Sequence, residues 1–351
     1  MLETLLRNVN RRRKEQLFRS PLFHTARSYA FVGVGVHSLT NLYPLLRLFN
    51  IRLKYVCTRH SDWSRQLSPL FPDCRFTHDP IDIARDEAIA GVFVCADPDA
   101  HFDLARLFLG AQKPVFIEKP PCSDLTQLNQ LLALDPGGIC KVGLQRRYWP
   151  GNRYLQKKIR QSTHYRYHFE TGPYPQGDVY TELFLHPLDY CAYLFGDLRL
   201  ESFSSHSHPT GTTLQAHVTH DGGCSGLLEL STGGSWNAAV EKLSVHTPKE
   251  ALDAEYPASV RGVPAPGRLL NLPTERLLNQ APVSRTYYSG CPSLIPALEY
   301  NPLVAQGFYH EIEAFLSLTE GKDARVCRND LPSLVHTYEL IGQFKRARGK
   351  A

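Results

Sequence analysis

A lysine at the end of a short apolar segment is the residue of this chain best placed to do chemistry. The run Pro114–Ile117 is apolar, and Glu118, Lys119 and Pro120 follow it directly. If the run is a strand of a parallel sheet, these residues lie at the carboxyl edge, where such sheets bind ligands. A lysine there can donate or accept a proton if its pKa lies near the working pH. Position alone therefore makes Lys119 a candidate for a reacting centre, the alternative being a solvated loop lysine.

A second group of ionisable residues lies further along the chain. His186 follows Glu182 by four residues and precedes Asp189 by three, spacings that put side chains on one face of a helix. Pro187, however, favours a helix start at this point, which would leave Glu182 in the preceding loop. The apolar neighbours of His186 also allow a second interpretation, a histidine of the core. Asp189 is interpreted as structural.

A glycine turn near the start of the chain indicates how a nucleotide could be held. The apolar run Tyr29–Val34 predicts a strand, Leu39–Phe49 predicts a helix, and Gly33, Gly35, His37 and Ser38 lie between or beside them. Turn glycines let the backbone approach a pyrophosphate, and a helix N-terminus offers N–H donors to it. Glycines in such turns are also common without any ligand. The motif alone leaves both interpretations open.

The residues after the second predicted strand, Ile51–Cys57, bear on which dinucleotide would bind. An acidic residue is expected there when a free ribose 2′-hydroxyl is held. The chain has Thr58 and Arg59 instead, and a hydroxyl with a guanidinium suits a 2′-phosphate. This favours NADP(H) over NAD(H), the alternative being that Arg59 is simply an exposed loop arginine.

The remaining pattern predicts an α/β protein with two domains. Strand-like and helical runs alternate up to about residue 144, as in parallel sheets built from βαβ units. Beyond Gln145–Pro150 the runs alternate polar and apolar residues, as in antiparallel strands with one buried face. We expect an N-terminal Rossmann domain and a C-terminal α/β domain built on an open, largely antiparallel sheet. The predicted divisions are a basic leader at 1–27, a dinucleotide-binding domain at 28–147 and a substrate and oligomerisation domain at 148–345. The elements expected within them are strands at Gly91–Cys95, Ile139–Leu144, Thr163–Thr171, Leu214–Thr219, Gly226–Leu230 and Glu241–His246, and helices at Phe102–Gly110, Asp124–Leu134, Glu182–Phe195, Gln306–Leu318 and Asp330–Lys345.

Composition excludes several classes of protein. The chain has 351 residues, 42% of them hydrophobic, and a net charge of +5. Seven basic and two acidic residues in the first 27 account for all of that charge, so we expect no nucleic-acid surface in the body. The nine cysteines include no C-x-x-C pair, which argues against a zinc site or disulfide framework and for a reducing cytoplasm. Residues 1–20 have the spacing of a basic amphipathic helix that would touch a membrane surface weakly, but a solvated or subunit-packed leader is preferred.

Six stretches in order resemble the glucose–fructose oxidoreductase / inositol dehydrogenase (Gfo/Idh/MocA) family. Together they span about residues 28–345, and their order is more specific than any single motif. They are Gly33–Ser38, Asp97-Pro98 with His101, Lys113–Pro120, Val142-Gly143 with Arg147–Pro150, Glu182 with His186 and Asp189, and the stretch from Tyr309 to Gly321.

The resemblance implies hydride transfer between a nicotinamide and a carbon of a sugar, cyclitol or sugar derivative, in a homo-oligomer. It implies that Lys119 is the lysine of the family's Glu-Lys-Pro motif and that His186 is its substrate-domain histidine. Our hypothesis is that Lys119 hydrogen-bonds the reacting oxygen, that His186 is the main proton donor or acceptor, and that Glu182 orients one of them. Arg147 would face the substrate, where it could bind a carboxylate or phosphate. The cofactor would contact Gly33, Gly35, His37, Ser38, Thr58, Arg59, Asp97, Pro98, His101, Glu118, Lys119 and Pro120.

Two alternatives remain open, and a departure from the family pattern motivates the first of them. The family usually has aspartate where this chain has Glu182, and a shift of about 1 Å at a reacting centre can be costly. The first alternative is a nucleotide-binding protein that has lost turnover. The second is a hydrolase or epimerase that cycles a tightly held cofactor without net consumption.

Overall fold

The computed structural model describes residues 8–9, 11–12, 27–59, 66–269, 272–274, 283–290, 301–321 and 329–348. The chain divides into two units, Met1–Gly143 with Glu311–Leu331, and Leu144–His310 with Pro332–Ala351. Almost all of the predicted leader, residues 1–27, lies outside the described residues. No helix among the described residues is long and apolar enough to cross a membrane.

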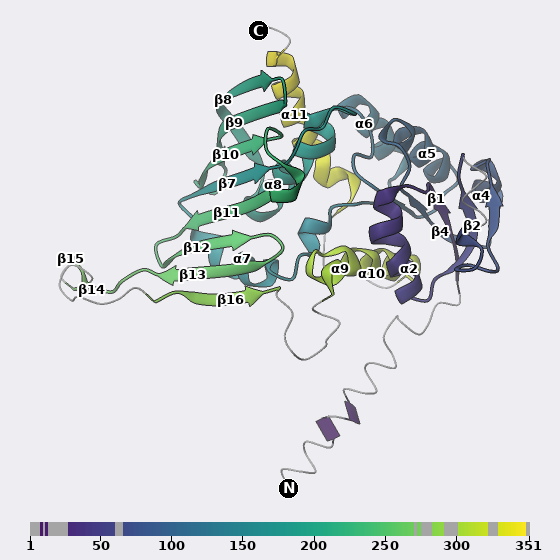
Figure 1. Cartoon of the computed structure of the whole chain (residues 1–351), viewed down its shortest axis with the longest axis horizontal. Helices are drawn as coiled ribbons and strands as arrows, with labels where there is room; N and C mark the ends of the chain where they lie inside the picture. The colour runs from purple at the N-terminus through teal and green to yellow at the C-terminus, as the bar shows by residue number, and fades with distance from the viewer. Residues whose placement is uncertain are drawn as a thin grey trace. The chain divides into compact units, whose positions relative to one another are not determined.

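The first unit is built on a six-stranded sheet whose strands are all parallel (Figure 1). The strand order is β3-β2-β1-β4-β5-β6, with the first βαβ connection at the centre, which is the order of the Rossmann fold. The strands are β1 (Ser28–Val32), β2 (Arg52–Cys57), β3 (Arg75–Thr77), β4 (Ile89–Val94), β5 (Val115–Ile117) and β6 (Cys140–Val142).

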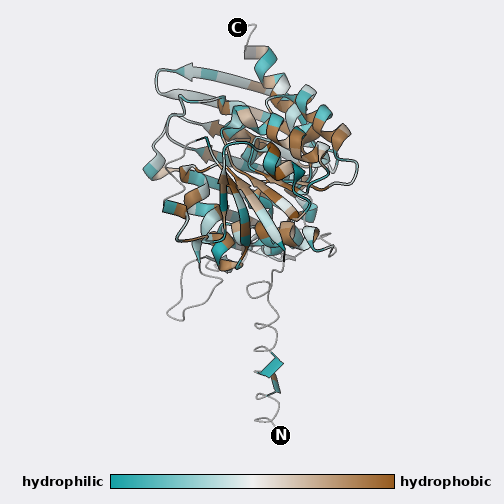
Figure 2. Cartoon of the chain, turned by 90° about the vertical axis from the view of Figure 1, so that its right-hand side faces the viewer, coloured by the Kyte–Doolittle hydropathy of each residue, from teal (hydrophilic) through white to brown (hydrophobic). Residues whose placement is uncertain are grey.

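Aromatic side chains form the core of this unit. Phe93 on β4 contacts Phe116 on β5 at 5.8 Å between ring centroids, and Phe315 of α10 (Phe308–Thr319) at 5.1 Å. The strands are buried throughout, and Figure 2 shows hydrophobic colour along them at the centre of the unit. The sequence assigned residues 311–331 to the second domain, whereas the structure groups them with the first. The reason is that Phe315 packs into this core, against Phe93 and Phe116.

The helices of the first unit begin where polar residues follow the strands. Asp124 caps α6 through a hydrogen bond from the Gln127 backbone N–H, 2.9 Å long, and Pro98 is the first residue of α5. Between β1 and the first helix lies one π-helical turn, which the sequence pattern did not predict. These elements are η2 (Ser38–Leu42), α2 (Tyr43–Leu48), α4 (Ile81–Arg85), α5 (Pro98–Gly110) and α6 (Leu125–Leu134).

The second unit is built on an eight-stranded sheet in the order β16-β13-β12-β11-β7-β10-β9-β8 (Figure 1). All neighbouring strands in it are antiparallel except β7 and β10, so the sheet is mixed and largely antiparallel. The strands are β7 (His164–Glu170), β8 (Leu198–His208), β9 (Gly211–His220), β10 (Ser225–Ser231), β11 (Val240–His246), β12 (Glu250–Glu255), β13 (Ser259–Pro264) and β16 (Arg285–Ser289), with a separate pair β14 (Arg268–Leu269) and β15 (Leu272–Pro273).

One face of this sheet is buried under two helices. On β7, Tyr167 and Phe169 alternate with more exposed residues, and their rings contact Tyr190 and Phe184 of the helical segment above. Phe344 of α11 packs edge-on against Phe203 of β8. The helices of this unit are η3 (Gln145–Tyr148), α7 (Asn152–Lys158), η4 (Ile159–Gln161), η5 (Tyr180–Phe184), α8 (Leu185–Phe195), η6 (Trp236–Ala238), α9 (Pro302–Ala305), η9 (Leu331–Leu334) and α11 (Val335–Arg348).

Candidate functional site

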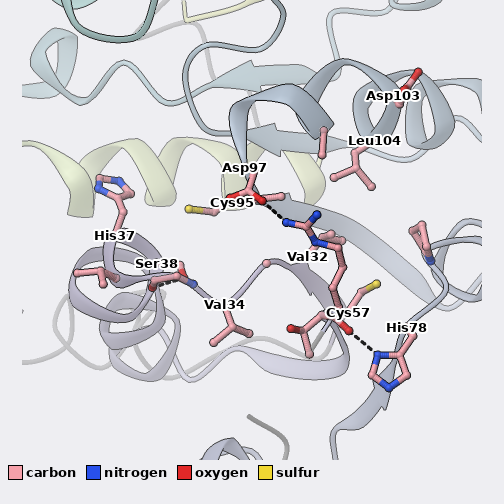
Figure 3. A pocket seen from close by; sticks show the side chains of 18 residues that line it. Val32, Val34, His37, Ser38, Cys57, His78, Cys95, Asp97, Asp103 and Leu104 are labelled. Carbon is pink, nitrogen blue, oxygen red and sulfur yellow. Dashed lines mark hydrogen bonds and ion pairs between the residues drawn. The ribbon is translucent and has the colours of Figure 1, made fainter. Parts of the chain in front are cut away.

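A cavity of about 570 Å³ opens at the carboxyl edge of the parallel strands in the first unit (Figure 3). Its walls come from the β1–η2 turn, from the ends of β2, β3 and β4, and from the first turns of α5. The predicted residues Gly33, Gly35, His37, Ser38 and Arg59 all line it. Thr58 and Asp97, also predicted, line it as well. The βαβ order therefore brings together residues that lie up to about 65 positions apart in the chain.

Two glycines shape the turn beneath this cavity, each for a different reason. Gly33 has φ of +106°, and a Cβ there would lie 2.0 Å from the carbonyl oxygen of Cys95. Gly35 meets nothing within 4 Å of an added Cβ, so its bare backbone faces open space. Ser38 closes the turn, because its hydroxyl lies 2.9 Å from both the N–H and the carbonyl oxygen of Gly35.

His37 connects this turn to the end of β5. Its Nε2 lies 3.3 Å from Oε1 of Glu118, which is buried. Burial by itself raises the pKa of Glu118, but the hydrogen bond and charge of His37, with the charge of Lys119, outweigh it and lower that pKa. A Cβ on Gly143 would lie 2.7 Å from Oε2 of Glu118, so this glycine makes room for the carboxylate.

Lys119 is half-buried at the carboxyl end of β5, and its peptide bond to Pro120 is cis. The backbone around it is held in place. The Lys119 N–H donates to Oε2 of Glu118 at 3.3 Å, and Nδ1 of the buried His101 donates to the carbonyl oxygen of Pro120 at 2.8 Å. Burial lowers the pKa of His101, so this ring is neutral near pH 7 and acts as a fixed hydrogen-bond donor.

The far end of the cavity holds a pair of opposite charges. Arg59, just after β2, forms an ion pair with Asp97, which precedes α5. The sequence predicted that both residues contact the cofactor. In the structure they pair with each other and both line the cavity, so the predicted cofactor contacts stay predictions. Thr58 is buried, and its N–H donates to the carbonyl oxygen of Thr77 at 3.1 Å. Pro98 begins α5, so its position is one of helix initiation.

Three ionisable side chains at the strand ends of the cavity wall were not predicted as site residues from the sequence. His78 follows β3, Cys57 is the last residue of β2, and Cys95 directly follows β4. Burial raises the pKa of the Cys57 thiol to about 11 and that of Cys95 well above its usual range, so both remain thiols at neutral pH. Their position at strand ends was the available signal, since such residues face the ligand edge of a parallel sheet.

In the second unit, the helix predicted at Glu182–Phe195 is confirmed, and the alternative that Glu182 lies in a loop is not. The helix begins before Pro187, with the π-helical turn η5, so Glu182 lies in a helical turn rather than in a loop. Its Oε2 accepts a hydrogen bond from the Tyr174 hydroxyl at 2.6 Å, and its Oε1 accepts one from the Asp178 N–H at 2.8 Å. Glu182 thus fastens the preceding loop to the helix. His186, in the first turn of α8, is buried.

Arg147 does not have the exposure expected of a substrate contact. Only 4% of this residue is exposed. Its Nε donates to Oδ2 of Asp189 at 3.0 Å, its Nη2 pairs with the same carboxylate, and its Nη1 donates to the Ser333 hydroxyl at 3.0 Å. The prediction that Arg147 faces the substrate is therefore wrong: burial and a two-point ion pair with Asp189 make it part of the core of the second unit.

These residues fit a dinucleotide in the first unit. Gly35 presents a bare backbone where an added Cβ would stand in open space, and the turn leads into a helix start. The cavity extends from this turn to Arg59, where a ribose 2′-substituent would lie in the Rossmann arrangement. Among the described residues, no group of three or more His, Cys, Asp and Glu side chains could hold a metal ion.

The chain thus contains a Rossmann domain with a nucleotide-sized cavity, joined to a second α/β unit. Residues 27–139 match the model of the Gfo/Idh/MocA oxidoreductase family, NAD-binding Rossmann fold. The chain is 30% identical over 185 residues to the "uncharacterized oxidoreductase YhhX" of Escherichia coli strain K12, a match that spans 48% of this chain and 53% of that protein. The match therefore spans about half the length of that curated relative. Over residues 27–139, the chain is therefore similar to the NAD-binding Rossmann domain of the Gfo/Idh/MocA oxidoreductases.

Two solved structures have the same fold over most of the chain. A levoglucosan dehydrogenase in complex with NADH has a TM-score of 0.74 at 15% identity, with 92% of this chain and 97% of that chain covered. A 3-ketoreductase from Actinomadura kijaniata, in complex with TDP-benzene and NADP, has a TM-score of 0.68 at 14% identity, with 91% and 96% covered. At these identities the likeness shows the fold.

Proposed function

We propose that the protein is an NAD(P)-dependent oxidoreductase that acts on a CH–OH group of a sugar, cyclitol or sugar derivative, with NADP(H) favoured over NAD(H). The observation that supports this proposal most is the contact between the β1–η2 turn and the carboxyl end of β5. His37 lines the cavity and contacts Glu118, the residue next to Lys119. Levoglucosan dehydrogenase supports the substrate class, because it has the same fold and acts on a sugar derivative.

The chain's own residues would manage the proton while the bound nicotinamide supplies or accepts the hydride. The side chains of Glu118 and His101 hold the backbone on either side of Lys119. Lys119 itself hydrogen-bonds the reacting oxygen through Nζ. Glu118 remains ionised beside it, because the neighbouring positive charges lower its pKa. His186 is proposed as the main proton donor or acceptor, on the strength of the family resemblance. Glu182 is proposed to support it by fixing the loop before η5.

Three further expectations stay predictions. The scattered cysteines favour a reducing cytoplasm, and the seven cysteines in the described part of the chain form no disulfide bond. The family resemblance implies a homo-oligomer. A weak membrane contact through residues 1–20 concerns residues that lie almost wholly outside the described part.

Substitution of Lys119 by methionine tests the proposed role of its amine. This change keeps most of the side-chain volume and removes the proton-carrying group, so turnover should fall by about 10² to 10⁴-fold. Binding of NADPH, followed by its fluorescence, should change little. The exposed Lys157 of α7 offers a matched control, and Lys157→Met should leave both quantities unchanged. Undiminished turnover in Lys119→Met would remove Lys119 from the mechanism.

A further inference from the structure

His78 occupies a position at the cavity that the proposed function has not used. It follows β3 and lines the cavity beside the end of β2 (Figure 3). Its Nδ1 lies 2.6 Å from the carbonyl oxygen of Thr58. Because a carbonyl oxygen only accepts hydrogen bonds, Nδ1 carries the hydrogen. The orientation of the ring is therefore fixed by the backbone at the end of β2, and Nε2 is the atom left to meet a ligand.

Arg59 and Asp97 stand at the same end of the cavity, and their ion pair is open to exchange. The two side chains are 76% and 65% exposed. Ion pairs this exposed contribute little to stability, because water and salt screen them. A phosphate offers a guanidinium a bidentate set of charged acceptors, which a ribose hydroxyl does not. A phosphate that enters this end of the cavity would therefore compete with the Asp97 carboxylate for the Arg59 guanidinium.

We infer that the cavity recognises the 2′-phosphate of NADP(H) through Arg59 and His78 together, and that this phosphate displaces Asp97 from Arg59. The inference rests on the proposed function, since it assigns residues to the cofactor of that same site. Arg59 supplies a fixed positive charge, His78 supplies a second donor when its Nε2 is protonated, and Asp97 is the competing anion. Without a 2′-phosphate, the Arg59–Asp97 pair remains intact and His78 gains no charged partner.

Loss of the His78 charge should weaken NADPH binding, whereas loss of the Asp97 charge should strengthen it. His78→Gln retains a donor for the Thr58 carbonyl but cannot become charged, so NADPH affinity should fall about tenfold. His78→Lys retains a positive charge and should keep most of that affinity. Asp97→Asn removes the competing anion and should strengthen NADPH binding about threefold. NADH affinity should stay within about twofold in each of these variants, because NADH has no 2′-phosphate to interact with Arg59 or His78.

Fluorescence titration of the full chain with NADPH and NADH in parallel tests this assignment. Arg75→Gln controls for a lost positive charge, since Arg75 on β3 does not line the cavity. Competition by adenosine 2′,5′-bisphosphate against adenosine 5′-monophosphate should show the same preference in the wild-type chain, which probes the 2′-phosphate without the nicotinamide.

The outcomes separate this inference from the proposed function. Equal losses for NADPH and NADH in His78→Gln would place the ring against the adenine or the fold and overturn the role of His78. Unchanged NADPH binding in Asp97→Asn would overturn the displacement of Asp97. A wild-type chain that binds neither reduced cofactor would overturn the proposed function, and this inference with it.

Discussion

The burial of Arg147 decides its role, and the sequence could not show that burial. Arg147 is the last residue of the first predicted domain and lies beside other polar residues, and an arginine in such a place is equally compatible with a ligand contact. The structure instead encloses it with Asp189, a residue 42 positions away that the sequence interpreted as structural. The partner of a buried charge depends on tertiary packing, which local pattern does not contain.

Removal of one member of this pair should therefore cost stability. Arg147→Met leaves the Asp189 carboxylate buried without its partner, which should lower the free energy of unfolding by about 3 to 5 kcal/mol. Denaturant unfolding followed by circular dichroism measures this loss. The double variant Arg147→Met with Asp189→Leu should recover much of it, because no uncompensated charge then remains. A fully stable Arg147→Met that binds an anionic sugar less tightly would support the original substrate role.

At the scale of elements, the β1–η2 turn separates a structural glycine from a ligand-facing one. Gly33→Ala should destabilise the first unit by about 1 to 3 kcal/mol, because the residue has a left-handed backbone and its Cβ would meet the Cys95 carbonyl. Gly35→Ala should leave the unfolding transition almost unchanged and weaken dinucleotide binding, since its Cβ would stand in the open space of the turn. Thermal unfolding and NADPH titration of both variants check this contrast. Equal effects of the two substitutions on stability would contradict it.

The contact of His37 with Glu118 joins that turn to the end of β5. Its contribution to the free energy of unfolding should depend on pH in the acidic range. The pKa of Glu118 is lower in the folded chain than in the unfolded chain. Its contribution to stability is therefore present above the ordinary glutamate pKa of about 4.3 and is lost as the pH falls through the lower folded value. Glu118→Gln should be less stable than wild type near pH 7, and the difference should shrink on acidification in this window. A difference independent of pH would show that Glu118 gains nothing from its charge.

At the scale of the whole molecule, the predictable part of the structure follows from simple periodicity. The Rossmann strands are short apolar runs with polar ends, and the glycine turn predicts from the sequence where the cavity lies. The strand β8 was missed because "LRLESFSSHSH" has few apolar residues and lies at a sheet edge with much of it exposed. The return of Phe315 to the first unit was missed because a helix pattern shows that a face is buried but not against which core.

The fate of the nicotinamide hydride tests the proposed function most directly. The wild-type chain is incubated with NADPH that carries deuterium at the transferable position of the ring, together with a panel of keto-sugars, keto-inositols and nucleotide-linked keto-sugars. Mass spectrometry then follows both the cofactor and the sugar. We expect net oxidation of NADPH and one deuterium in the reduced sugar. Binding without turnover, or sugar conversion with no net loss of NADPH, would contradict it in favour of a non-catalytic binding protein or a cofactor-cycling enzyme.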